Sequence, residues 1–242
     1  MVCNLLLHCG SAQVERQELS EVHTPAATYS WQPIPHDLLL KQVEATLPRY
    51  GMRVVNEAHG LSHDGNRYFG LLEVANGSNH PDYSRVLGIR NSHDKRFPAG
   101  LVLGNQVLVC DNLSFSGEIK VARKHTSMIL SDLSHLIDDG VCRLRDSWHE
   151  QDRRIERYQD CGLRDPVMHD LTIHALDKGV ICGSQVPKVL SEYRQPRHDA
   201  FQPRTLWSWF NAVTETLKGN LGLLPGRTQR LHSLCDTHVA FN

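Results

Sequence analysis

Residues 53–75, RVVNEAHGLSHDGNRYFGLLEVA, decide the fold of this chain. Valine, tyrosine, phenylalanine and leucine, which favour β-strands, are concentrated on both sides of His63-Asp64-Gly65-Asn66. Within that tetrapeptide, Asp-Gly supplies residues that adopt positive φ in a tight turn. The stretch therefore predicts a hairpin of two antiparallel strands, Arg53 to His59 and Tyr68 to Ala75.

Further strand-like segments follow the hairpin. The middle one is interrupted at Gly104, which indicates either a strand pair or one bulged strand. Turn-forming residues at 77–79, 91–92 and 97–98 separate the segments. Because these connections are too short for crossover helices, about five or six strands should form an antiparallel meander. The segments are Tyr83 to Arg90, Leu101 to Leu103 with Gln106 to Cys110, and Glu118 to Arg123.

Helical periodicity flanks the predicted sheet on both sides. Apolar residues recur at helical spacing in residues 36–50, between Pro35 and Gly51, which favour a helix start and a helix stop. Beyond residue 125 apolar residues recur at three-, four- or seven-residue steps, which predicts a long amphipathic helix from Ile129 to about Tyr158. Shorter helices are predicted at 167–178, 185–193 and 205–218, with a last turn at 227–234.

The predicted fold class is α+β, with an N-terminal helix, a meander sheet, a long helix and shorter C-terminal helices. All 242 residues are expected to form one domain. We expect an extended N-terminal arm in residues 1–35, with Trp31 as its anchor. The helix and the sheet occupy 36–126, and a helical part packs on them in 127–242.

Composition excludes several classes of protein. The chain has 26 Lys plus Arg, 27 Asp plus Glu and 40% hydrophobic residues, values that exclude a disordered chain and a strongly basic nucleic-acid coat. No run of about 18 apolar residues occurs, and residues 1–10 do not resemble a secretory signal. The seven cysteines are scattered without a CxxC pair, so we expect reduced thiols in a cytoplasm.

Basic and amide side chains gather at the ends of the predicted strands. Between Arg85 and His125 the sequence contains seven basic and three acidic residues, although the whole chain carries a net charge of −1. A meander brings such strand ends together, and a locally basic sheet is typical of a surface that binds the phosphate backbone. An ordinary turn, in which side chains bond the local backbone, explains residues 91–94 equally well. In this hypothesis Asn91 and Asn112 either bond the nucleic-acid backbone or order the strand-end loops. The candidate nucleic-acid-binding residues are Arg90, Asn91, Lys95, Arg96, Asn112, Lys120, Arg123 and Lys124.

A divalent metal ion is the alternative cofactor for the same strand ends, whereas the nucleic-acid hypothesis requires no cofactor. Histidine and aspartate are common metal ligands in nucleases. Their spacing here matches no HExxH, Cys/His zinc or EF-hand pattern. The candidate ligands are His93, Asp94, Asp111 and His125.

Other catalytic signatures are absent from the sequence, including GxGxxG, GxxxxGK[ST] and GxSxG. Residues 205–215, TLWSWFNAVTE, form the densest aromatic stretch. Leu206 and Phe210 share one helix face, for which core packing is the favoured interpretation. Trp207 and Trp209 cannot both share that face, which leaves an interface or a base-stacking surface open for one of them. Lys218, Arg227 and Arg230 form a second basic group without nearby acidic residues, either for binding or as a solvated helix end.

A series of motifs extends along the chain: Asn4-Leu5-Leu6-Leu7-His8, Thr28-Tyr29-Ser30-Trp31, Gly88-Ile89-Arg90-Asn91-Ser92-His93-Asp94-Lys95, Val109-Cys110-Asp111-Asn112-Leu113, Arg123-Lys124-His125-Thr126, residues 207–215 and Arg227-Thr228-Gln229. Together these motifs resemble the phage- and plasmid-associated family catalogued as domain of unknown function 932. The resemblance covers nearly the whole chain and implies a protein of a mobile element, working beside replication or recombination genes in a bacterial cytoplasm. It implies no catalytic residues.

Three functions remain open at this point. The first is single-stranded DNA binding or annealing without catalysis, by a homo-oligomer, because single-strand annealing proteins have a similar order of elements. The second is a metal-dependent nuclease or hydrolase. The third is a protein-binding inhibitor of a host defence factor.

Overall fold

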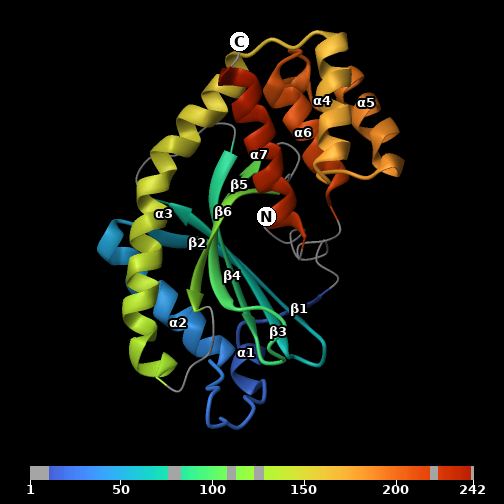
Figure 1. Cartoon of the computed structure of the whole chain (residues 1–242). Coiled ribbons are helices and arrows are strands. Elements are labelled where there is room, and N and C mark those ends of the chain that lie inside the picture. Colours follow the sequence, from blue (N-terminus) through green and yellow to red (C-terminus); the bar gives the residue numbers. More distant parts are fainter. Residues whose placement is uncertain (1–10, 76–82, 108–112, 123–127, 219–222, 241–242) are drawn as a thin grey trace.

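A six-stranded antiparallel sheet forms the centre of the molecule, and its strands lie side by side in sequence order (Figure 1). The computed structural model describes residues 11–75, 83–107, 113–122, 128–218 and 223–240. The predicted α+β class and the antiparallel meander are confirmed. The strands are β1 (Ala12–Val14), β2 (Arg53–Ser62), β3 (Arg67–Ala75), β4 (Tyr83–Ser92), β5 (Ala99–Val107) and β6 (Leu113–Ala122).

The strands differ from the prediction in the N-terminal arm, at the end of β4 and at the start of β6, which begins at Leu113 and not at Glu118. β1 and the short helix α1 (Glu18–Glu21) lie in the arm that was expected to be wholly extended, and β1 pairs with the far end of β2. β4 continues through Asn91 and Ser92, which were expected in a turn, because both residues pair with β3. β5 is one strand whose pairing with β6 shifts between Leu103 and Gly104, as the bulged alternative predicts. Residues 77–79 lie outside the described residues.

The two hairpin turns that follow β2 and β4 meet at one end of the sheet. His63, Asp64 and Gly65 have φ of 54°, 56° and 80°, so the expected positive-φ turn extends over three residues. The backbone N–H of His93 donates to the carbonyl oxygen of Asn66 at 2.7 Å. This contact fixes the β4–β5 turn against the β2–β3 turn.

Helices α2 (His36–Thr46) and α3 (Ile129–Asp160) cover one side of the sheet, which we call the α3 face (Figure 1). α2 continues as a 3-10 turn to Tyr50 and stops at Gly51, whose φ of 71° is accessible to glycine without strain. The expected helix of residues 36–50 is thereby confirmed, as is the long helix. One stripe of α3 packs on alternate residues of β3, β4 and β5. It consists of Ile129, Leu133, Ile137, Val141, Leu144 and Trp148.

The opposite side of the sheet, the α7 face, is partly covered by α7 (Leu224–Ala240) (Figure 1). α7 is much longer than the single turn expected, and Pro225 lies in its first turn, where a missing N–H is tolerated. Thr228 Oγ1 accepts a hydrogen bond from the Phe115 backbone N–H at 3.1 Å, which attaches α7 to β6. The remaining helices pack beyond the sheet, around the second half of α3. They are α4 (Asp165–Asp177), α5 (Val186–Arg194) and α6 (Leu206–Thr216).

Two expectations from composition concern membranes and thiols. Among the helices of the described residues, none is long and apolar enough to cross a membrane. The cysteines within the described ranges, Cys142, Cys161, Cys182 and Cys235, are all free. Reduced thiols were expected for these positions.

Candidate nucleic-acid interface

Neighbouring residues at the end of β4 point to opposite faces of the sheet. Arg90 lies on the α7 face, in one cross-strand row with Phe69 of β3 and Gly100 of β5. Asn91 lies on the α3 face, opposite Tyr68. Successive side chains of a strand alternate between faces, so these two candidate residues cannot contact the same ligand surface.

Asn91 is fully buried and belongs to a polar cluster under the strand end. Its Nδ2 donates to the Ile34 carbonyl oxygen at 2.6 Å and to His36 Nδ1 at 2.9 Å. His36 Nε2 lies 2.9 Å from the Gly65 carbonyl oxygen, so Nε2 carries the proton and Nδ1 accepts. Of the two roles expected for Asn91, contact with the nucleic-acid backbone and ordering of the strand end, its burial leaves the second.

His93 completes this buried cluster. Its ring stacks on His36 with centroids 3.9 Å apart, and its Nε2 donates to the Ile34 carbonyl oxygen at 2.9 Å. Burial lowers the pKa of His93, because the charged form would lose its hydration. The side chain is therefore neutral at pH 7 and holds the β4–β5 turn against the start of α2.

Asp94 orders the turn itself. Its Oδ1 accepts from the Ser92 hydroxyl at 2.5 Å, and its Oδ2 accepts from Arg67 Nε at 2.7 Å. Burial alone would raise the pKa of Asp94, but the hydrogen bonds from Ser92, Arg67 and the Arg96 backbone N–H outweigh it and lower the pKa. The acid of this turn thus neutralises Arg67 on β3.

Three basic side chains, those of Arg90, Lys95 and Arg96, occupy the same turn and the strand before it. Lys95 has a φ of 61° and places its Nζ 4.5 Å from the centroid of the Trp31 ring. Arg96 is exposed. Within the described parts of the chain, neither Lys95 nor Arg96 forms an ion pair with an acidic side chain. Both are available to an external anion.

Arg90 takes part in an aromatic group on the α7 face. Its guanidinium carbon lies 5.2 Å from the centroid of Phe97, and the rings of Phe69 and Phe97 are 5.5 Å apart. Both phenylalanines are half-buried, so part of each ring faces solvent. A cation over a half-exposed ring combines charge with a stacking surface.

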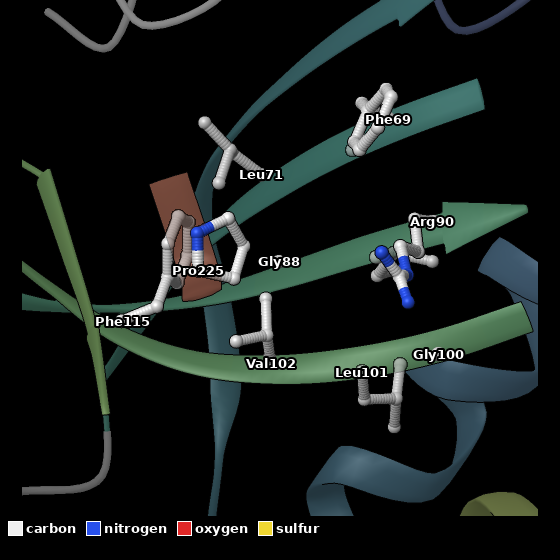
Figure 2. Close-up of a pocket in the computed structure, with 11 residues that line it drawn as sticks. Phe69, Leu71, Gly88, Arg90, Gly100, Leu101, Val102, Phe115 and Pro225 are labelled. Atoms are coloured by element: carbon white, nitrogen blue, oxygen red, sulfur yellow. The ribbon is translucent and has the colours of Figure 1, made fainter. Parts of the chain in front are cut away.

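A hollow on the α7 face adjoins this group (Figure 2). Leu71, Val102, Phe115 and Pro225 line it, and Arg90 is the one charged residue among the described residues that do so. Strand-interior glycines at 88 and 100 also belong to the lining and contribute no side chains. A Cβ at Gly88 would come within 2.6 Å of Val102 Cγ1, so this position requires glycine.

β6 contributes one more candidate by its register. Lys120 pairs with Gly100, which pairs with Arg90 in turn, so both basic residues occupy one row across three strands. β6 ends at Ala122, opposite Ala99, and hence at the same sheet end as the β4–β5 turn. Asn112, Arg123 and Lys124 lie outside the described residues.

The described residues contain no cluster of side chains that would support the alternative of a metal site. Among them, no group of three or more histidine, cysteine, aspartate or glutamate side chains could hold an ion. His93 Nε2 is committed to Ile34, and Asp94 to Ser92 and Arg67. The other two candidate ligands, Asp111 and His125, lie outside the described ranges.

Other positive side chains are engaged elsewhere. Arg85 is buried, lies 5.3 Å over Trp148 and pairs with Asp152 at 2.7 Å, so it does not belong to the surface. In the second basic group, Lys218 pairs with Glu215 at 2.5 Å, and Arg230 donates to the Gly179 carbonyl oxygen at 2.9 Å. The expectation that this group lacks acidic neighbours is wrong for Lys218.

The interface or base-stacking position left open for one tryptophan of residues 205–215 is not found. Trp209 has no exposed surface and donates from Nε1 to Thr172 Oγ1 at 3.0 Å. Trp207 is 5% exposed and stacks on Phe210 with centroids 5.5 Å apart. α6 is enclosed on all sides by other elements, so both indoles lie in the core.

Sequence reasoning missed Phe69, Phe97, Arg67 and the hollow. Two signals were available for the hollow. Phe69 and Leu71 alternate on β3, Gly88 interrupts one predicted apolar strand and Gly100 directly precedes another, and glycine in or beside a strand marks a close approach or a missing side chain. The contact of Phe97 with Phe69 depends on strand pairing and has no local signal.

Comparison of the chain with protein-family models, with curated proteins and with solved structures gives no match.

Proposed function

We propose that the protein binds single-stranded DNA through the α7 face and the adjoining β4–β5 turn. The supporting observation is the alternation of cations and aromatic rings at one end of the sheet. Lys95 lies over Trp31, Arg90 lies over Phe97, and Arg96 is exposed beside them. Basic side chains attract the phosphate backbone, and aromatic faces stack on bases whatever their sequence.

A single strand fits this surface better than a duplex. In a duplex the bases already stack on one another, so Phe69 and Phe97 would find no free base face. A single strand offers both its phosphates and its base faces to the same surface. The half-buried state of both rings supports this preference.

The charge of the chain favours binding by several copies together. With a net charge of −1 and a few basic residues at the site, one protomer contributes few phosphate contacts. Linking weak sites in a homo-oligomer raises the overall affinity without new contacts. We therefore propose an oligomer that binds or anneals single strands during replication or recombination of a phage or plasmid.

Fluorescence anisotropy of a labelled 20-nucleotide oligothymidine (dT20), titrated with the protein at several salt concentrations, tests the proposal. We expect binding whose logarithmic affinity falls linearly with the logarithm of the salt concentration. Gels of the same mixtures with and without Mg²⁺ should show an intact oligonucleotide. Absence of binding, or affinity that does not depend on salt, would refute the proposal. Cleavage that requires Mg²⁺ would favour the nuclease hypothesis.

A further inference from the structure

The hollow on the α7 face is an apolar recess placed directly beside basic side chains. Apart from Arg90, the described residues lining it are apolar or glycine. Figure 2 shows Phe69 and Arg90 along one margin and Phe115 with Pro225 at the other. Apolar lining removes the hydrogen-bond partners that a phosphate or sugar would need, so the hollow and the cations suit different parts of a ligand.

We infer that this hollow receives an unstacked base of the bound strand while the neighbouring cations hold its phosphates. The inference rests on the proposed function and adds to it that one base leaves the stack of its neighbours and enters the hollow. Each nucleotide of a nucleic-acid strand carries a flat base next to a negatively charged phosphate. That chemistry matches an apolar recess bordered by Arg90 and the basic turn.

The backbone register places one margin of the recess. Phe69 and Arg90 are directly opposite each other on β3 and β4, so their side chains border the recess on the same side. Gly100, the partner of Arg90 on β5, contributes only backbone to the lining.

Because Gly88 has no side chain, Val102 and Phe115 can pack over it and form the floor of the recess. Val102 and Phe115 close over Gly88, and a Cβ there would lie 2.6 Å from Val102 Cγ1 and 3.3 Å from the Phe115 ring. The floor is therefore formed by two packed apolar side chains. A base lying on them would bury apolar surface on both partners, which favours binding near 25 °C.

The decisive experiment compares dT20 with a 20-nucleotide oligomer of abasic sites, using the unaltered protein. Both ligands carry the same phosphates, so phosphate contacts alone predict equal affinity. We expect dT20 to bind roughly tenfold more tightly, which corresponds to about 1.4 kcal/mol. A 20-base-pair duplex should bind more weakly than dT20, because its bases are already stacked.

A substitution pair then assigns the effect to the hollow. Phe69→Ala should lower the affinity for dT20 severalfold and leave the affinity for the abasic oligomer unchanged. Ile173→Ala, which removes an exposed apolar side chain on α4, should change neither. Equal affinity for dT20 and the abasic oligomer, with salt dependence retained, would refute base binding and leave the phosphate surface standing. Failure to bind either ligand would refute the proposed function as well.

Discussion

The side-chain Nδ2 of Asn91 donates a hydrogen bond to the backbone carbonyl oxygen of Ile34, at a distance of 2.6 Å. This bond joins the end of β4 to the chain that leads into α2, across 57 positions of sequence. The same amide reaches His36 Nδ1, and His93 donates to the same carbonyl oxygen. One buried amide thus positions the strand end from which the basic turn projects.

Replacing Asn91 by alanine should lower the free energy of unfolding by about 2–4 kcal/mol, because it leaves buried acceptors on Ile34 and His36 without this donor. Urea unfolding followed by circular dichroism measures the loss. Asn66→Ala is the matched control, since its amide bonds the His63 carbonyl oxygen at an exposed site, and it should lose less than about 1 kcal/mol. Equal losses in the two variants would show that the buried cluster has no special role.

The combined substitution of Lys95→Gln and Arg96→Gln should weaken dT20 binding and make its salt dependence shallower. Each lost phosphate contact on a single strand should reduce the slope of log affinity against log salt by about 0.7. Anisotropy titrations at four or more salt concentrations give that slope. Arg143→Gln with Lys178→Gln removes two exposed charges from α3 and the end of α4, and it should leave the slope unchanged. An unaltered slope in the first variant would remove these residues from the interface.

Thr228 should control the attachment of α7 to the edge strand β6. Its Oγ1 accepts from the Phe115 N–H at 3.1 Å and lies 2.9 Å from the Phe115 carbonyl oxygen, with no exposed surface. Thr228→Val keeps the shape but leaves the Phe115 N–H unsatisfied, which should destabilise the fold by about 1–3 kcal/mol.

Hydrogen exchange followed by mass spectrometry should detect the same change locally. The peptide covering residues 113–122 should exchange faster in Thr228→Val than in the unaltered protein, because the amide of Phe115 loses its acceptor. Thr237→Val provides the control, since its hydroxyl bonds the Ser233 carbonyl oxygen on an exposed part of α7. Unchanged exchange in this peptide would contradict the role of Thr228.

Local patterns in the sequence predict most of the elements but not how they meet. Alternation and the Asp-Gly turn suffice for the hairpin of β2 and β3, and four-residue spacing suffices for α3. β1 has three residues and no period of its own, so its pairing with β2 depends on the finished sheet. The basic residues of the site could also be predicted from the sequence, because they lie at the ends of strands that the sequence itself predicts.

The rest of the site depends on contacts between distant segments. The alternation of side chains along a strand is enough to place Arg90 and Asn91 on opposite faces of the sheet. Which of the two faces is buried under α3 depends on how the helices pack on the sheet. The burial of both Trp207 and Trp209 has the same origin, because the Thr172 acceptor of Trp209 comes from a different helix. Side chains such as Phe97 acquire a role only when strand pairing brings Phe69 beside them.

His232 of α7 is a buried histidine whose charged form the fold disfavours. Tyr158 Oη lies 3.3 Å from its Nδ1 and donates to Asp236 Oδ1 at 2.7 Å. Burial, reinforced by the positive charge of Arg154, lowers the pKa of His232 to about 3. In the unfolded chain its pKa is about 6.5.

Acid should therefore destabilise the protein through His232. Between pH 6.5 and about 3 the unfolded chain binds a proton at this residue that the folded chain does not bind, so the free energy of unfolding falls as the pH falls. From pH 7.5 to 5 the loss from this residue should be about 2 kcal/mol, at about 1.4 kcal/mol per pH unit below 6.5. Urea unfolding at the two pH values should show a smaller loss in His232→Gln than in the unaltered protein. Burial also lowers the pKa values of His59, His93 and His238, so these residues contribute to the loss that remains. Gln229→Ala, which removes an exposed and uncharged side chain of the same helix, should keep the full loss. An identical loss in His232→Gln and the unaltered protein would mean that this histidine does not titrate on unfolding.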